Sequence, residues 1–477
     1  MTDACEWHHR GFTRIVNGMA GPVVAPRIVR GSRVVTPEGV RPAAIHLDGG
    51  RIVRVGAIED APRGADVLDA GDLVVLPGLV DTHVHANEPG RTEWEGFESV
   101  TRAAAAGGVT TLLDMPLNSV PATTSADALA AKADAARGRV SVDVGFIGGV
   151  VPGNAGDLAA LRDAGVLAFK CFLVPSGVPE FEHVDEDDLR EALPVLERMG
   201  AVLMVHAESP RVIERAAPTV ASEAVRRSYA AYLASRPPEA EREAVELVTR
   251  LAEEIGARVH IVHLSSGETV PMIRAARRRG VRLTAETCPH YLALDAGCVT
   301  DGATEFKCAP PIRSAADRDA LWAALRAGDV DMIVSDHSPC PPAMKGGGTG
   351  DFFACWGGIA SLQLGASVIW TELHARGLPI ELLARWMSDA PARLVGLEER
   401  KGSIAAGRDA DLVLFDPDAE WRVDGASLFH RHPITPYAGR MLRGAVEATY
   451  LRGRLVYERA RGPVGDPAGR LLLPNDG

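Results

Sequence analysis

Two histidines separated by one residue, His83 and His85, end an apolar run that begins at Leu76. Side chains alternate across a β-strand, so the two imidazoles would point to the same side. Neutral imidazole is a common metal ligand, and a strand holds two of them at a fixed separation. His-x-His is a short motif, however, and both rings could instead make ordinary hydrogen bonds in a core. By itself the pair leaves a metal site and a structural role open.

Other apolar runs also end in side chains that can ligate a metal or transfer a proton. Lys170, His206, His263 and Asp336 each stand at the end of such a run. If these runs are parallel strands of one barrel, their carboxyl ends meet on a single rim. The sequence therefore predicts that six groups, the first two histidines included, converge on one site.

Lys170 is unusual in this set because a protonated amine repels cations and is costly to bury. One interpretation is a Schiff-base lysine, as barrel aldolases use, which needs no histidine neighbours. The other is reaction with CO2, which converts the amine to an anionic carbamate with two oxygens that can bridge two metal ions. Four histidines and a carboxylate on the same rim favour the carbamate, N6-carboxylysine.

Two divalent ions about 3.5–4 Å apart would acidify a bridging water, and the resulting hydroxide is the expected nucleophile. Asp336 could ligate one ion, accept the proton during attack on a carbonyl, and deliver it to the departing nitrogen. Zinc suits the histidine-rich donor set, although manganese, cobalt, iron or nickel could use the same ligands. We therefore expect two divalent ions per subunit, with zinc as the first choice.

The elements that must position these groups alternate between strand and helix over residues 76–396. This alternation predicts an α/β fold, a closed (β/α)8 barrel of the TIM type, and a doubly wound sheet is the alternative. The eight expected strands are Val74 to His85, Thr110 to Met115, Val142 to Ile147, Leu167 to Leu173, Val202 to Ala207, Val259 to Leu264, Arg282 to Glu286 and Met332 to Asp336.

Short β-type runs and turns lie on both sides of the predicted barrel. Residues 27–75 and 397–461 are expected to form one smaller composite β-sandwich. Residues 1–26 are polar and lack the apolar core of a signal peptide, so we expect a flexible N-terminal tail. Residues 462–477 are rich in proline and glycine and are expected to form a C-terminal tail.

Composition limits the partners of the chain. Of 477 residues, 46% are hydrophobic and 24% charged, as in globular proteins, and no apolar run approaches the ~18 residues that cross a bilayer. The net charge of −12 opposes a phosphate backbone. Seven scattered cysteines form neither a disulfide framework nor a Cys-x-x-Cys pair, which is typical of reduced thiols. We expect a cytoplasmic protein that acts on a small molecule, without a nucleic-acid or membrane partner.

From Arg27 to Tyr457 the chain resembles the cyclic amidohydrolases, the family of dihydroorotase, hydantoinase/dihydropyrimidinase and allantoinase. The resemblance rests on the segments His85 to Phe97, Asp114 to Ser119, Phe169 to Phe172, Glu286 to Tyr291 and Ser335 to Cys340. It implies that one metal ion is held by His83, His85 and Asp336. A second ion would be held by His206 and His263, and a carboxylated Lys170 would bridge the two ions. It also implies a homotetramer or homodimer.

Within that family the motifs are most similar to those of the allantoinase subgroup. That similarity implies hydrolytic opening of the hydantoin ring of (S)-allantoin to allantoate in purine degradation. Family members that bind an anionic dihydroorotate carry an arginine and a histidine where this chain has Asn87 and Cys340. Neither residue is a cation, so an anionic substrate would lose charge-assisted hydrogen bonds there. The alternatives are a hydantoinase or dihydropyrimidinase and, outside the enzymes, a metal-free scaffold with an amidohydrolase-like barrel.

Three residues are predicted to contact the substrate: Asn118, Asn87 and Ala309. Asn118 offers both a donor and an acceptor to amide groups, although asparagine also forms turns. The glycine-rich run from Lys345 to Gly350 lacks a preceding strand and the Gly-Lys-Ser/Thr ending of a phosphate loop. We expect this run to be a mobile gate over the rim.

Overall fold

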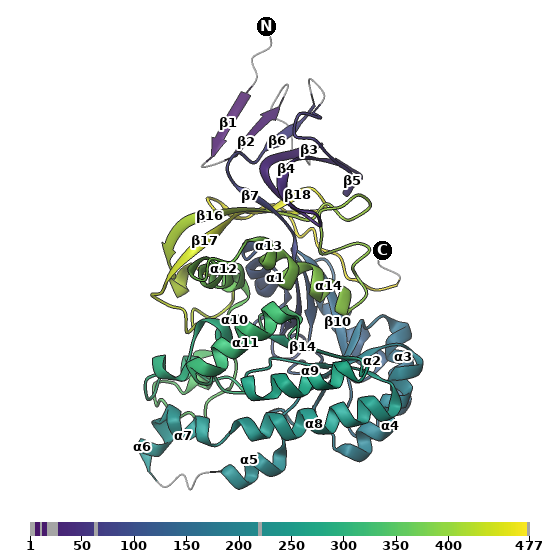
Figure 1. Cartoon of the computed structure of the whole chain (residues 1–477), viewed down its shortest axis with the longest axis vertical. Coiled ribbons are helices and arrows are strands. Elements are labelled where there is room, and N and C mark those ends of the chain that lie inside the picture. Colours follow the sequence, from purple (N-terminus) through teal and green to yellow (C-terminus); the bar gives the residue numbers. More distant parts are fainter. Residues whose placement is uncertain (1–4, 10–11, 17–26, 62–64, 218–221, 475–477) are drawn as a thin grey trace.

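Two sheets, one parallel and one mainly antiparallel, organise the computed structural model, which describes residues 5–9, 12–16, 27–61, 65–217 and 222–474. The antiparallel sheet, drawn in purple and yellow, lies above the helix-covered parallel sheet along the long axis of the molecule (Figure 1). The purple and yellow strands come from opposite ends of the chain. Strands from the N-terminal and C-terminal parts of the chain therefore lie in the same sheet.

The parallel sheet contains eight strands, each hydrogen-bonded to the next in chain order. A parallel bridge between Val84 and His337, with a 2.9 Å hydrogen bond from the His85 N–H to the His337 carbonyl, joins the first strand to the chain that follows the last. The sheet therefore closes, and the predicted α/β barrel is confirmed over the doubly wound alternative. The strands are β8 (Leu79–Val84), β9 (Val109–Asp114), β10 (Asp143–Gly149), β11 (Ala168–Phe172), β12 (Val202–His206), β13 (Arg258–Ile261), β14 (Leu283–Thr287) and β15 (Met332–Ile333).

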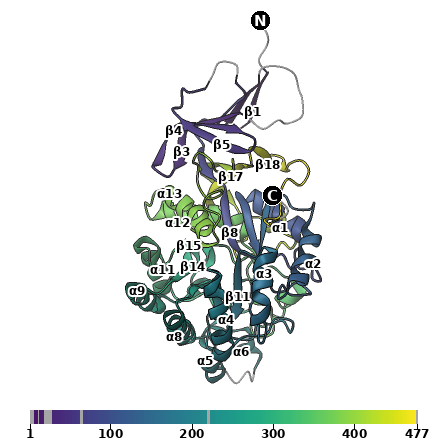
Figure 2. The ribbon, with the colours of Figure 1, turned by 90° about the vertical axis from the view of Figure 1, so that its right-hand side faces the viewer.

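Helices surround the barrel, as the view in Figure 2 shows around β8 and β11. Their ends follow local capping chemistry: Asp185 and Ser314 each begin a helix with a reciprocal capping box, and Gly256 and Gly328 end helices in the left-handed conformation. The helices are α1 (Phe97–Ala106), α2 (Ala126–Ala136), α3 (Leu158–Ala164), α4 (Glu186–Arg198), α5 (Pro210–Ala216), α6 (Glu223–Arg227), α7 (Tyr229–Ala234), α8 (Pro238–Ile255), α9 (Val270–Arg278), α10 (Pro289–Ala293), α11 (Ala315–Ala327), α12 (Gly365–Ala375), α13 (Glu381–Ala384) and α14 (Ala390–Leu394).

The second sheet joins both ends of the chain because β7 pairs antiparallel with β16. Ile45 and Ile52 from the first half of the chain and Leu412 and Tyr450 from the second share one buried apolar cluster. This confirms the expected composite β-unit. Its strands are β3 (Ile28–Thr36), β4 (Gly39–Asp48), β5 (Arg51–Gly56), β6 (Val67–Asp69), β7 (Val74–Pro77), β16 (Leu412–Arg422), β17 (Met441–Leu451), β18 (Arg454–Glu458) and β19 (Gly462–Pro463).

The structure divides one expected strand between the two sheets. The run from Val74 to His85 becomes β7 in the β-unit and β8 in the barrel, with Gly78 between them. A Cβ at Gly78 would overlap the side chain of Thr110, so only glycine fits this crossing. The last expected strand is also shorter, because β15 ends at Ile333 and Asp336 lies in the following loop.

Both segments that were expected to be tails pair with strands in the rest of the chain. In the N-terminal segment, β1 (Cys5–His9) pairs with β2 (Phe12–Val16), and β2 pairs with β6, while residues 1–4, 10–11 and 17–26 lie outside the described residues. In the C-terminal segment, Leu471 forms a parallel bridge with Val144. The Asp143 carboxylate also accepts a 2.9 Å hydrogen bond from the Arg470 N–H. This buried carboxylate gives a Pro/Gly-rich segment a fixed position.

None of the helices in the described part of the chain has the length and apolar character that a bilayer crossing requires. The six cysteines whose side chains are described are free thiols, as expected from their spacing.

Candidate active site

His83, His85 and Asp336 form the first cluster of side chains at the carboxyl end of the barrel. The Nε2 atom of His83 lies 3.2 Å from the Asp336 Oδ1 atom, and the Nε2 atom of His85 lies 3.6 Å from the same oxygen. One ligand atom from each residue lies within 4.8 Å of those of the other two, and all three residues are buried. Three donors aimed at one point match the needs of a divalent ion.

His206 and His263 form a second cluster beside the first. The Nδ1 atom of His206 faces the Nε2 atom of His263 at 2.9 Å. The His263 ring also lies near the first cluster, with its centroid 5.4 Å from that of the His83 ring. The structure thus brings together the four histidines that the sequence placed at strand ends.

Lys170 lies in the middle of β11, and its side chain is fully buried. Its Nζ atom lacks a hydrogen-bond partner among the described residues, an arrangement that is costly for an amine. Burial lowers the pKa of Lys170 to about 8, although Glu286 and Asp336 oppose this shift. A lower pKa favours the neutral amine, which is the form that reacts with CO2. An unpartnered amine between histidines fits a carbamate better than an ammonium ion.

His83, His206 and His263 are in the protonation state that metal ligation requires. Burial lowers the pKa of His83 and of His263 well below the usual value, and it also lowers the pKa of His206. Each ring is therefore neutral near pH 7 and keeps one nitrogen lone pair for a metal ion. The donor set of four imidazoles, one carboxylate and one amine fits two divalent ions.

Two carboxylates that the sequence analysis did not assign orient these rings. Glu286 accepts a 2.5 Å hydrogen bond from the His83 Nδ1 atom, and it also contacts the His260 ring nitrogen at 2.9 Å. Glu208 accepts a 2.8 Å hydrogen bond from the His206 Nε2 atom. Such carboxylates hold a ligating imidazole in one orientation and one tautomer. The positions of these two carboxylates in the sequence could have indicated their role. Glu208 follows His206 by two residues, and Glu286 lies near the end of the seventh strand.

Backbone strain is concentrated at this rim. The described residues include five non-glycine residues with positive φ, and four belong to the site: Asn87 at 63°, Asn118 at 69°, His263 at 39° and Asp336 at 45°. Such conformations cost energy and persist where the surrounding structure enforces them, which is typical of functional sites.

The model of the amidohydrolase family matches residues 74–456. The chain belongs to the amidohydrolase family. It is 50% identical over 446 residues to the allantoinase of Streptomyces avermitilis, covering 93% of this chain and 98% of that protein. It is 43% identical over 462 residues to the allantoinase of Arabidopsis thaliana, covering 93% of this chain and 90% of that one. Among solved structures it is similar to the L-hydantoinase (dihydropyrimidinase) from Arthrobacter aurescens, with a TM-score of 0.88, 31% identity and coverage of 94% and 99% of the two chains.

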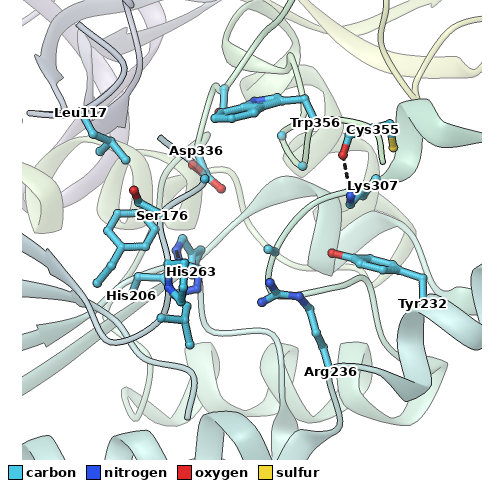
Figure 3. A pocket seen from close by; sticks show the side chains of 18 of the residues that line it. Leu117, Ser176, His206, Tyr232, Arg236, His263, Lys307, Asp336, Cys355 and Trp356 are labelled. Carbon is cyan, nitrogen blue, oxygen red and sulfur yellow. Dashed lines mark hydrogen bonds between the residues drawn. The ribbon is translucent and has the colours of Figure 1, made fainter. Parts of the chain in front are cut away.

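A cavity of about 620 Å³ opens over the histidines of this amidohydrolase (Figure 3). Asn118 and Ala309, two of the predicted substrate contacts, line it. Asn87 is absent from the described lining and lies behind Asn118, whose Nδ2 atom donates a 3.0 Å hydrogen bond to the Asn87 Oδ1 atom. Asn87 thus holds Asn118 beside His85, and its contact with a substrate stays a prediction.

The segment on either side of the glycine-rich run Lys345 to Gly350 forms part of the cavity wall of the amidohydrolase. Met344 and Trp356 both line the cavity. The Lys345 Nζ atom is buried and donates hydrogen bonds of 3.0 and 3.2 Å to the carbonyls of Lys307 and Trp356. This anchors one end of the run, and the mobility of the gate stays a prediction.

Proposed function

We propose that this amidohydrolase is an allantoinase, which opens the hydantoin ring of allantoin by hydrolysis to give allantoate in purine degradation. One observation carries the proposal: the relatives that share 50% and 43% of its residues over 93% of the chain, one bacterial and one from a plant, are both named allantoinase. The geometry supports it, because five of the six potential ligands, the four histidines and Asp336, line one cavity of suitable size for a small ring.

The proposal includes two divalent ions, with zinc as the ion that best suits the donors. His83, His85 and Asp336 would hold one ion, His206 and His263 the other, and carboxylated Lys170 both. When bound, such ions polarise a carbonyl and acidify water near neutral pH. Glu286 and Glu208 would keep the first and second sets of imidazoles in place through the hydrogen bonds already described.

Asp336 is the proposed proton carrier of the reaction. Its carboxylate would accept the proton that the attacking water loses as the water oxygen adds to the ring carbonyl carbon. It would return that proton to the ring nitrogen as the C–N bond breaks, which leaves a carboxylate and a free ureido group. Asn118 would hold the amides of the substrate, since its side chain lines the cavity beside His85.

A second candidate function is that of a hydantoinase or dihydropyrimidinase, which the likeness to the L-hydantoinase structure favours. Turnover of allantoin, hydantoin, dihydrouracil and dihydroorotate in one assay separates the two. We expect kcat/KM to be highest for allantoin, and equal use of unsubstituted hydantoin would refute the allantoinase proposal. The metal content of the purified protein tests the scaffold alternative, because a scaffold would contain no metal ion.

A further inference from the structure

Two cationic side chains, Arg236 and Lys307, line the same cavity as the histidines. In Figure 3 they lie with Tyr232 across the cavity from Asp336. Arg236 follows α7, and Lys307 lies in the loop before α11. Neither belongs to the set of potential metal ligands, so this wall needs an explanation of its own.

One side of the Arg236 guanidinium is hydrogen-bonded to the protein, and the other side faces the cavity. Its Nη1 atom donates to the Glu208 carboxylate, the same group that holds His206. About a fifth of its side-chain surface, 22%, is accessible. Its remaining N–H groups have no hydrogen-bond partner among the described residues, and the guanidinium lines the cavity. Arg236 can therefore donate to a bound molecule without releasing Glu208.

Lys307 presents its ammonium group beside Arg236. Its Nζ atom donates to the Cys355 carbonyl and lies 5.3 Å from the centroid of the Tyr232 ring. The Tyr232 hydroxyl does not compete for this space, because it donates a 2.8 Å hydrogen bond to the Cys308 carbonyl. An ammonium group has three N–H donors. Among the described residues, only the Cys355 carbonyl accepts a hydrogen bond from one of these three donors.

Arg236 is paired with Glu208, whereas Lys307 has no carboxylate partner among the described residues that line the cavity. Asp336 is the one carboxylate among the described lining residues, and it belongs to the opposite cluster. Two cations that share a mostly buried wall repel each other and lose hydration. An electron-rich oxygen of a bound molecule would relieve both effects. The reacting carbonyl would be beside Asp336, so this oxygen belongs to a substituent that points away from the reacting ring atoms.

We propose that Arg236 and Lys307 bind the carbonyl oxygen of the exocyclic ureido group and thereby select ureido-substituted hydantoins over unsubstituted hydantoin. This inference rests on the proposed function and adds a residue-level cause for its specificity. A cavity built to donate hydrogen bonds to one substituent disfavours an analogue without it, because the donors are then left unpaired. Asn87 and Cys340 supply no cation, whereas Arg236 and Lys307 supply two from other parts of the barrel rim.

The experiment compares kcat/KM for allantoin and for unsubstituted hydantoin in the full-length, metal-loaded enzyme and in the variants Lys307→Met, Lys307→Arg and Arg236→Lys. We expect Lys307→Met to lower kcat/KM for allantoin by about 10- to 100-fold, the loss of a charged hydrogen bond, and to change that for hydantoin by less than about 3-fold. Lys307→Arg keeps the charge and should retain part of the preference. Arg236→Lys should reduce the preference in the same direction, and this variant carries the test if Lys307→Met does not fold.

A matched control is Lys401→Met, which removes another buried ammonium, one that contacts Asp143 and Asp411 and is absent from the described cavity lining. This variant should affect both substrates by the same factor. If Lys307→Met and Arg236→Lys also lower both kcat/KM values equally, the two residues have a structural role and the inference is wrong. Failure of the proposed function is a separate result, because the unmodified enzyme would then show no preference for allantoin.

Discussion

The Nδ1 atom of His206 lies 2.9 Å from the Nε2 atom of His263, although 57 positions separate the two residues in the chain. The other nitrogen of His206 is held at 2.8 Å by Glu208. Two neutral imidazoles thus face one point, with the orientation of one fixed from behind. Protein contacts would therefore hold the proposed ligand pair in place before a metal ion binds, which lowers the entropic cost of metal binding.

Glu208→Gln should weaken metal binding at this pair. Burial opposes ionisation of Glu208, but the charge of Arg236 and the hydrogen bond from His206 hold its pKa at about 2, so the carboxylate is ionised at pH 7. An amide orients the imidazole less strongly, and we expect a loss of about 10- to 100-fold in affinity. The measurement is the metal content per chain after dialysis against a series of chelator concentrations.

The matched control for Glu208→Gln is Glu243→Gln, because Glu243 also accepts hydrogen bonds from an arginine and a hydroxyl but contacts none of the four histidines and is absent from the described cavity lining. This variant should bind metal as the unmodified protein does. Equal metal retention in both variants would contradict an orienting role for Glu208.

Lys170→Ala should abolish allantoin turnover, and short carboxylic acids such as formate or acetate should restore part of it. The expected reason is that a free carboxylate can occupy the space of the lost carbamate and supply two oxygens. The assay is allantoin turnover over a range of acid concentrations, with chloride as the ionic-strength control. Full activity of Lys170→Ala without any added acid would exclude the bridging carbamate.

Asp336→Asn should lower kcat by about 100- to 10,000-fold, the usual contribution of a general acid–base group. The amide has a similar shape and retains an oxygen, so the loss reports proton transfer and ligand charge more than packing. Steady-state kinetics should be paired with metal analysis of the same sample. A variant that retains both metal and near-normal kcat would remove Asp336 from the proposed mechanism.

The barrel was predictable because the sequence records its strands locally, as apolar runs that alternate with helices. The predicted site residues lie within or just after those runs, and parallel strands bring their carboxyl ends to one rim. Arg236 and Lys307 could not be found in this way, because they lie in loops where no periodicity indicates direction. The C-terminal segment was also missed, since its position depends on Asp143, a carboxylate far away in the chain.

The KM for allantoin should rise as the pH passes about 8. Burial is the main cause that lowers the pKa of Lys307 to about 8, with Lys345 and Arg236 adding to the shift while Cys355 and Asp351 oppose it. A lysine with a lowered pKa is charged below that value and neutral above it, so its donation to the ureido oxygen weakens as the pH rises.

This pH effect is tested by measuring KM for allantoin and for hydantoin from about pH 6.5 to about pH 9.5, a range on both sides of the pKa of Lys307. In Lys307→Arg the guanidinium stays charged throughout, so the rise in KM for allantoin should disappear. An identical pH profile in that variant would assign the effect to another group. Hydantoin serves as the internal control, because it has no ureido oxygen to lose the contact.

Lys401→Met should destabilise the junction between the barrel and the β-unit without changing the chemistry of the folded enzyme. The Lys401 Nζ atom lies 2.7 Å from carboxylate oxygens of Asp143 and Asp411 and 3.0 Å from one of Asp409. All four side chains are buried, so removal of the cation leaves carboxylates that repel one another in a poorly hydrated space. We expect a loss of ~3–5 kcal/mol in the free energy of unfolding, measured by urea denaturation.

The control variant is Arg393→Met, which removes a largely exposed ion pair with Asp389 and should lower the free energy of unfolding by less than ~1 kcal/mol. Equal losses in the two variants would show that burial of the Lys401 cluster contributes nothing beyond an ordinary surface ion pair.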